Sequence, residues 1–238
     1  MIQNLPPYIA IIFVLTTLAT LLLFYWAVKN SDAEATRKKS AMIVAGLTVW
    51  LLIQAAVTLK GLYNTNTTAA PPKLLLLGIL PPMLTIILLF STIKGRQFTD
   101  SLPLKNITYI NLVRVPVELV LLTLFLNKAV PQLMTFEGRN FDIFSGITAP
   151  FVAWFGFRKG KLSRTFLLAW NFVCLAFLAN VVTYAILSAP LPTQQFAFDQ
   201  PNIAILYFPF SWLPTFIVPI VLFGHLTSIK QLMKTKSE

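Results

Sequence analysis

Long apolar stretches separated by short polar segments dominate the chain. A helix that crosses a bilayer needs about 20 apolar residues, because about 30 Å of hydrocarbon is covered at about 1.5 Å per residue. Seven stretches reach or approach this length, and the fifth is the shortest and the most interrupted by small and polar residues. They predict transmembrane helices over residues 7–28, 41–59, 74–93, 107–127, 141–157, 165–188 and 203–229.

Composition supports this interpretation. Of the 238 residues, 56% are hydrophobic and 11% are charged, whereas soluble domains are about 25% charged. The connections between the stretches are too short to hold a soluble domain. A single cysteine excludes a disulfide framework and a cysteine-rich metal site. We therefore expect an all-α fold, with residues 1–238 forming one integral membrane domain of seven transmembrane helices.

The positions of the basic residues predict an orientation, because cytoplasmic loops carry an excess of lysine and arginine. Fourteen of the 19 lysines and arginines fall in the tail and in the loops that follow the first, third and fifth stretches. Four fall in the other loops, and one lies inside a stretch. This bias places the N-terminus outside and the C-terminus in the cytoplasm, and it accounts for the net charge of +11. The expected partner is thus the lipid bilayer and not nucleic acid, and the compact chain suggests a bacterial inner membrane.

The fourth stretch contains two charged residues that a membrane helix would normally lack. Arg114 and Glu118 are four residues apart and share a helical face, with Asn111 one turn earlier. Each charge costs about 2.5–3.5 kcal/mol at the centre of a membrane helix, so this face should meet other helices or a polar cavity. Such residues are a functional hypothesis by default. The alternative is an Arg114–Glu118 ion pair that only stabilises the bundle.

Two polar residues of the last two stretches fall at a similar depth. Asn171 and His225 can therefore join Asn111, Arg114 and Glu118 in one pocket in the cytoplasmic half of the membrane. Arg114 would hold an anionic group bidentately. Glu118 would be its counter-ion or a proton-coupling carboxylate. The alternative for His225 is a structural histidine near a helix end.

A second acidic group is predicted on the outer side. Glu137, Asp142 and Asp199 could form an outer acidic mouth for a cation or a cationic solute. The structural alternative is that Asn140 caps the fifth helix, with Asp142 in its first turn at the favourable end of the helix dipole.

Other polar and proline residues predict helix packing and helix distortion. Trp50 and Gln54 of the second stretch, together with Pro81 and Pro82 of the third, are typical of contacts between membrane helices. The last stretch should be bent or locally unwound, because prolines occupy positions 209, 214 and 219.

The sequence predicts a membrane protein that binds or transports a small anionic or lipid-like ligand in the pocket of the fourth helix. Two alternatives stay open: a scaffold subunit of a membrane complex, and a membrane-embedded lipid-modifying enzyme that uses Glu118 and His225. No cofactor is expected, because one histidine argues against bis-histidine haem and multi-histidine zinc sites.

Overall fold

The fold is all-α in a computed structural model that describes residues 2 and 5–234, and no strand occurs among these residues. Five helical segments have at least 20 residues, and some of them join two or three consecutive helices. Shorter helices lie between these segments. The α-helices are α1 (Pro7–Lys29), α2 (Glu34–Lys38), α3 (Ser40–Leu59), α4 (Leu80–Ser91), α5 (Ile93–Asp100), α6 (Leu104–Tyr109), α7 (Arg114–Leu126), α8 (Asp142–Val152), α9 (Arg164–Leu187) and α10 (Val218–Met233). The π- and 3₁₀-helices are η1 (Leu75–Ile79), η2 (Ile110–Val113), η3 (Gln132–Met134), η4 (Ala153–Arg158), η5 (Ala204–Leu206) and η6 (Leu213–Ile217).

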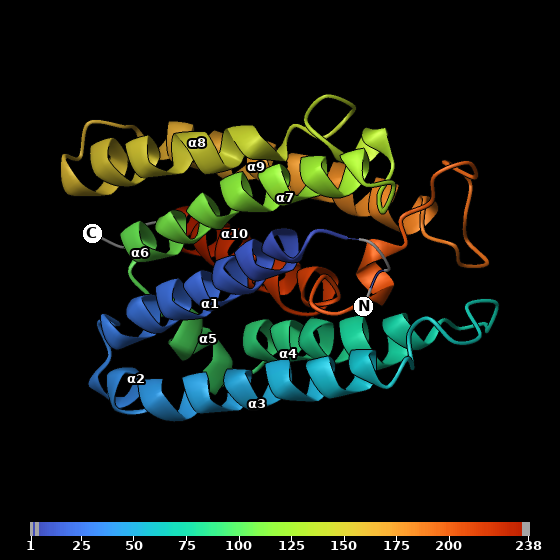
Figure 1. The fold of residues 1–238 in the computed structure, drawn as a ribbon. Helices are drawn as coiled ribbons and strands as arrows, with labels where there is room; N and C mark the ends of the chain where they lie inside the picture. The colour runs from blue at the N-terminus through green and yellow to red at the C-terminus, as the bar shows by residue number, and fades with distance from the viewer. Residues whose placement is uncertain (1, 3–4, 235–238) are drawn as a thin grey trace.

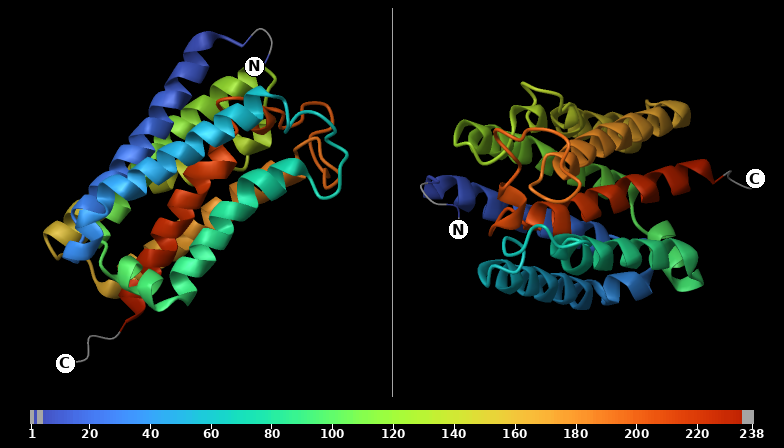
Figure 2. Two further views of the ribbon diagram at one scale, coloured as in Figure 1. Left: turned by 90° about the horizontal axis from the view of Figure 1, so that it is seen from below. Right: turned by 90° about the vertical axis from the view of Figure 1, so that its right-hand side faces the viewer.

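The long helices lie side by side along a common direction (Figure 1). α10 lies in the interior, where it packs against α9, α6 and α4. The short helices α2 and α5, the start of α6 and the end of α10 gather at one end of the bundle, whereas the loops 60–74, 127–141 and 188–212 lie at the other. Figure 2 shows that α1 begins at the end opposite to the one where α10 finishes.

Five helical segments are long and apolar enough to cross a membrane: Pro7–Lys29, Ser40–Leu59, Leu104–Leu126, Arg164–Leu187 and Leu213–Met233. A sixth is possible if Leu75–Ser91 and Ile93–Asp100, which meet at a 90° bend, are taken together. The predicted helical fold is therefore confirmed, with five or six helices of membrane-spanning character. The expected fifth span, 141–157, corresponds to α8 and η4, which together fall short of this length.

The expected span 203–229 is wrong at its start, because the helix begins at Leu213. The residues before it form the turn η5 and further turns. Ile205 and Leu206 are apolar because they are buried against Tyr63, Leu74 and Ala189, and not because they face lipid. An apolar stretch can thus be a buried loop.

The predicted cytoplasmic loop after the third span instead contains the helix α5. The chain turns at Thr92, whose side chain accepts a hydrogen bond from the Gly95 N–H at 3.2 Å. A Cβ at Gly95 would lie 2.4 Å from the carbonyl oxygen of Leu89, so only glycine permits this turn. α5 therefore lies at a right angle to α4 and packs against the end of α10.

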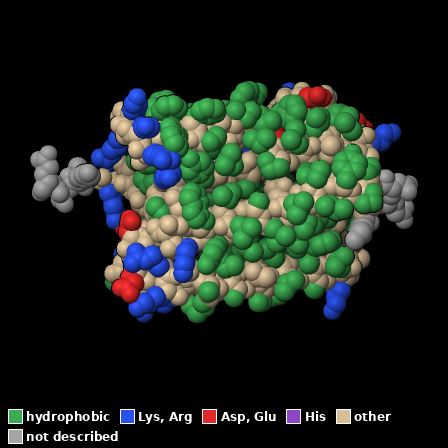
Figure 3. Space-filling view, turned by 60° about the vertical axis from the view of Figure 1, so that its left-hand side comes forward, with side chains coloured by type: hydrophobic (Ala, Val, Ile, Leu, Met, Phe, Trp, Pro, Cys, Tyr) green, Lys and Arg blue, Asp and Glu red, His purple; other side chains and the backbone are tan. Residues whose placement is uncertain are grey.

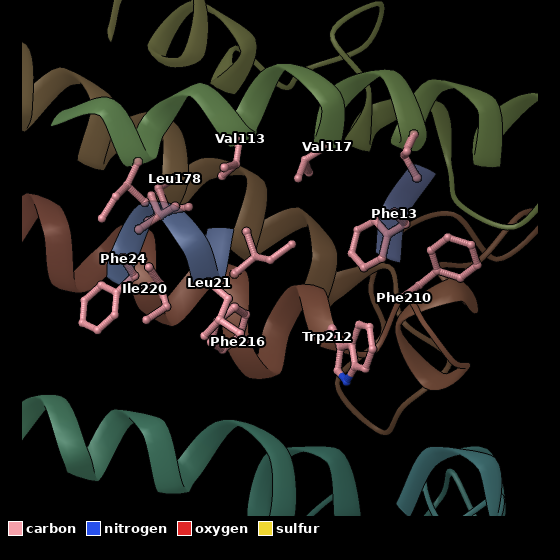
Figure 4. Packing of buried hydrophobic residues seen from close by; sticks show 14 of the residues in the cluster. Phe13, Leu21, Phe24, Val113, Val117, Leu178, Phe210, Trp212, Phe216 and Ile220 are labelled. Atoms are coloured by element: carbon pink, nitrogen blue, oxygen red, sulfur yellow. The ribbon is translucent and has the colours of Figure 1, made fainter. Parts of the chain in front are cut away.

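Apolar side chains fill the interior and also cover the sides of the bundle. Phe13, Val117, Phe210 and Phe216 are among those that meet between α1, α7 and α10 (Figure 4). Large apolar residues are also exposed on the outside, for example Leu52, which is 63% exposed. Figure 3 shows hydrophobic side chains across the middle of one face and lysines and arginines gathered mainly at one end. Such extensive apolar exposure is expected in lipid and not in water.

Proline distorts the helix in η6 and α10, and α3 compensates for the distortion. Pro219 has no N–H, so the carbonyl four residues earlier loses its normal helical partner. That carbonyl belongs to Thr215, and the indole Nε1–H of Trp50 donates to it at 2.9 Å. The predicted role of Trp50 in helix–helix contact is confirmed.

The same relationship holds between α3 and the start of α4. Pro81 deprives the Leu77 carbonyl of its helical donor, and the side-chain amide of Gln54 donates to this carbonyl at 3.1 Å. The Gln54 oxygen in turn accepts from the hydroxyl of Tyr63 at 2.5 Å. Burial raises the pKa of Tyr63 to about 12, although its hydrogen bond to Gln54 acts in the opposite direction, so the phenol is a donor at neutral pH. Gln54 thus links α3 to η1, which continues into α4, and to the loop between α3 and η1.

Candidate functional site

Arg114 lies inside the bundle, where the 3₁₀-helix η2 continues into α7, and it is only 2% exposed. The start of α8 packs closely against it because residue 146 is a glycine. A Cβ at Gly146 would lie 2.8 Å from Val115 Cγ2 and 3.2 Å from Arg114 Cβ. The small residue therefore brings the first turn of α8 against the side of α7 that carries the arginine.

The ionic partner of Arg114 is Asp142, the first residue of α8. The distance from Arg114 Nη1 to Asp142 Oδ1 is 3.1 Å, and the side chains are 3% and 7% exposed. Arg114 Nη1 also donates to the backbone carbonyl of Cys174 on α9 at 3.4 Å. The expected ion pair between Arg114 and Glu118 is wrong. Close packing of α8 at Gly146 supplies a carboxylate from another helix, and Glu118 has a different partner.

Glu118 is held by an asparagine of the preceding loop. Its Oε1 accepts a hydrogen bond from Asn140 Nδ2 at 2.6 Å, and the same amide nitrogen donates to the Met134 carbonyl at 3.0 Å. Asn140 Oδ1 accepts from the Asp142 N–H at 3.0 Å, a local turn contact just before the helix. The predicted N-cap is therefore wrong by one residue, because the N-cap of α8 is Phe141, whose side chain does not cap the helix, whereas Asp142 lies in the first turn as expected. Asn140 therefore fixes both acidic residues relative to Arg114.

These three charged residues lie at the wall of a cavity of about 420 Å³. This volume is in the range of small-molecule sites. The rest of the wall is almost entirely apolar and comes from η1, α4, α7, α9, η6, α10 and the outer loops. The lining residues include Leu75, Ile79, Met83, Val117, Leu121, Leu175, Leu178, Ala179, Val182, Ile186, Leu191, Thr193, Ile205, Leu213, Val218, Val221 and Leu222.

Several buried polar atoms of this cluster have no hydrogen-bond partner among the described residues. They are Arg114 Nε and Nη2, Glu118 Oε2, Ser145 Oγ and Asp142 Oδ1, the last of which is in ion-pair contact with Arg114 but accepts no hydrogen bond. An unpaired buried polar atom costs about 1–3 kcal/mol, so native interiors usually satisfy such atoms with protein groups, water or a ligand. The free donors belong to Arg114, and a free acceptor belongs to Glu118.

The other residues predicted for this pocket do not line the cavity. His225, which is fully buried, has its Nδ1 2.9 Å from Asn171 Oδ1, and Asn171 Nδ2 donates to the Leu167 carbonyl at 2.9 Å. Asn111 donates to the carbonyl of Thr108 in its own helix. In the described part of the chain, His225 makes no hydrogen bond to Glu118, whose side chain accepts from Asn140.

The predicted outer acidic mouth does not form. Asp142 is buried and paired with Arg114, whereas Glu137 and Asp199 are exposed in the loops. α8 begins well inside the bundle, so the loop before it carries Asp142 inward. Asp142 therefore belongs to the cavity with Arg114 and Glu118. Among the described residues, no group of three or more histidine, cysteine, aspartate or glutamate side chains could hold a metal ion.

Sequence reasoning missed the contribution of Cys174 and the contact between Asn140 and Glu118. Cys174 acts through its backbone carbonyl, which no sequence pattern reveals.

Comparison with known proteins gives a family without an assigned activity. No curated protein and no solved structure matches the chain. The family described as a domain of unknown function, DUF8737, matches residues 71–233. This segment covers α4 to α10 and contains Arg114, Glu118, Asn140 and Asp142. The chain belongs to the DUF8737 family.

Proposed function

We propose that this protein binds an amphipathic, lipid-like ligand inside the membrane, in the cavity beside Arg114. The observation that carries the proposal is the composition of the cavity wall, which is apolar except for Thr193 and the three charged residues Arg114, Glu118 and Asp142. Apolar walls favour a hydrocarbon part of the ligand through burial of apolar surface. The charged residues offer hydrogen bonds and charge to a polar part.

A purely structural role explains the ion pair but not the rest of the cluster. Arg114 and Asp142 would suffice to join α7 to α8. Glu118 adds a second buried carboxylate whose Oε2 has no partner among the described residues. A buried charge that is only partly compensated is costly. A ligand group that satisfies these atoms would account for their presence at the cavity wall.

Native mass spectrometry of the protein, extracted with the surrounding membrane, tests the proposal. Ala179 on α9 is exposed and lines the cavity, so Ala179→Trp fills the cavity without altering the charged cluster. Ala176, one turn earlier on α9, is also exposed but does not line the cavity, so Ala176→Trp is the matched control. A bound lipid-like molecule is expected in the wild type and in Ala176→Trp and should be lost in Ala179→Trp. Absence of such a molecule, or its retention in Ala179→Trp, would contradict the proposal.

We also propose seven membrane crossings, with the N-terminus outside and the C-terminus in the cytoplasm of a bacterial inner membrane. The start of α1 and the end of α10 lie at opposite ends of the bundle, as an odd number of crossings requires (Figure 2). The lysines and arginines counted as cytoplasmic lie in segments at the end where α10 finishes. Lys236, which belongs to this count, is outside the described residues.

Cysteine labelling in intact cells tests this orientation. The native Cys174 is buried and gives little background. Cysteines at the exposed positions Thr68 and Gln195 should react with an impermeant thiol reagent, whereas cysteines at the exposed positions Lys38 and Lys159 should not. The opposite labelling pattern would invert the topology.

A further inference from the structure

The cavity is bounded on two sides by helices that face the outside of the bundle. α4 contributes Met83, and α9 contributes Ala179 and Val182. α10 lies between these helices and packs against both (Figure 1). Because these walls continue into exposed apolar side chains, such as Ile186 at 42% exposure, the cavity opens sideways between α4 and α9.

The outer loops cover the end of the cavity that points away from the finish of α10. Pro72, Leu191, Thr193 and Ile205 line this end. Leu191 and Thr193 belong to the segment between α9 and η5. Backbone hydrogen bonds hold this segment in place, including Asn202 N–H to the Ser188 carbonyl at 2.8 Å. A ligand therefore reaches the cavity from the bilayer more directly than from water.

The free edge of Arg114 defines the chemistry of the polar group. Nη1 is engaged by Asp142 and Cys174. Nε and Nη2 are buried and have no partner among the described residues. These two nitrogens form one edge of the planar guanidinium, and their N–H groups are parallel. This edge matches the paired oxygens of a carboxyl or phosphate group.

The charges nearby favour a carboxylic acid over a phosphate. Arg114, Asp142 and Glu118 together carry one excess negative charge when all are ionised. A phosphate would add one or two more negative charges to a buried cluster, which is costly. A carboxylic acid can enter with its proton and add none. It then offers an acceptor oxygen to Arg114 and an O–H to the free Oε2 of Glu118.

Building on the function proposed above, we infer that the ligand is a long-chain carboxylic acid that enters from the bilayer between α4 and α9. Its carbonyl oxygen accepts from the Nε and Nη2 edge of Arg114, and its O–H donates to Glu118 Oε2. Its hydrocarbon chain lies along η6 and α10 between Leu213 and Leu222, both of which line the cavity. The acid is neutral in the form that crosses the apolar opening.

Equilibrium binding of radiolabelled palmitic acid to the purified protein in an uncharged detergent tests this inference. Hexadecanol has the chain but not the acid, and acetate has the acid but not the chain. We expect hexadecanol to compete at least about tenfold more weakly than unlabelled palmitic acid, and acetate not to compete. Dodecyl phosphate, which carries a phosphate on a chain, should also compete more weakly than dodecanoic acid.

Two variants locate the binding. Arg114→Lys keeps a positive charge beside Asp142 but lacks the guanidinium edge, so its affinity for palmitic acid should fall about tenfold with little change in melting temperature. Ala179→Trp should abolish binding, and Ala176→Trp should leave it unchanged. Equal binding of palmitic acid and hexadecanol, or unchanged affinity in Arg114→Lys, would overturn the inference that the ligand is a carboxylic acid. The proposed function would then still stand. Tighter binding of dodecyl phosphate, or competition by acetate, would also overturn the carboxylic-acid inference.

Failure of the carboxylic-acid inference can be distinguished from failure of the proposed function. If palmitic acid does not bind, but a lipid-like molecule is still lost from Ala179→Trp in native mass spectrometry, only the ligand class is wrong. If no amphiphile binds and none co-purifies, both proposals are wrong.

Discussion

Arg114 of α7 and Asp142 of α8 form an ion pair that is buried inside the bundle, with 3.1 Å between Nη1 and Oδ1. The two residues lie on different helices, and Gly146 lets these helices approach closely enough for the contact. Removing one member of a buried pair leaves an uncompensated charge, whereas removing both can be neutral. Comparing the stability of the single and double variants therefore measures whether the two residues act as a buried pair.

The single variants Arg114→Leu and Asp142→Leu should each destabilise the protein by about 3–5 kcal/mol, and the double variant should recover most of the loss. The free energy of unfolding in mixed micelles measures this. The exposed pair Glu34–Lys38 is the control, because its disruption should cost less than about 1 kcal/mol. Harmless single variants, or a double variant as unstable as the sum of the singles, would show that the two residues are not buried partners.

Glu118→Gln should change stability much less than either variant of the ion pair. Glutamine keeps an oxygen that can accept from Asn140 Nδ2, and Arg114 keeps its bond to Asp142. We expect a change within about 1 kcal/mol and, if the cavity binds a carboxylic acid, a change in affinity for that acid. A stability loss as large as that of Arg114→Leu would make Glu118 the true ionic partner.

Asn140→Ala should destabilise the protein by about 2–3 kcal/mol, because it removes a donor to the Glu118 carboxylate and an acceptor for the Asp142 N–H. Asn127→Ala is a suitable control, since Asn127 is exposed and its side chain donates to the Thr123 carbonyl in the preceding turn of α7. Melting temperatures of the two variants can be compared directly. Equal melting temperatures would show that Asn140 does not organise the cluster.

The length and apolarity of the stretches predicted the helices, because these properties act within single segments of the chain. The start of the last span could not be predicted from them. Ile205 and Leu206 are apolar residues of a buried turn, and apolarity alone does not distinguish such a turn from a helix that faces lipid. The unusual charges identified Arg114 and Glu118. The partner of Arg114 depends on the depth at which α8 begins and on the space at Gly146, and these are properties of tertiary packing.

The proline-compensating contact of Trp50 predicts a rescue. Trp50→Phe leaves the Thr215 carbonyl without its donor and should cost about 1–3 kcal/mol. Pro219→Ala supplies a backbone N–H to that carbonyl. It should therefore reduce the free energy of unfolding less in the Trp50→Phe background than in the wild type, or even increase it. A double-mutant cycle measures the coupling. Additive effects would show that the two donors do not serve the same carbonyl.

The contact between α5 and α10 predicts a pH dependence. Asp100 Oδ1 lies 3.0 Å from Lys230 Nζ, and Asp100 Oδ2 pairs with Lys234. Desolvation alone would raise the pKa of Asp100, but the hydrogen bonds from Lys234 and Lys230 together with their charges lower it below its usual value. The stabilisation is therefore complete above about pH 4 and is lost as the pH falls through the depressed pKa.

The melting temperature of the wild type should thus exceed that of Asp100→Asn at about pH 7, by an amount typical of exposed ion pairs, and the difference should vanish in stronger acid, below the depressed pKa. A difference that persists there, or that is absent at neutral pH, would show that these charges do not stabilise the contact.

The most direct test of the central claim is an experimental density map of the protein in a nanodisc made from its own membrane. We predict elongated non-protein density between α4 and α9, beside η6 and α10 from Leu213 to Leu222, with its polar end in contact with the Nε and Nη2 edge of Arg114. A cavity closed by contact of α4 with α9, or one that contains only isolated water peaks beside Arg114, would contradict a ligand-binding role.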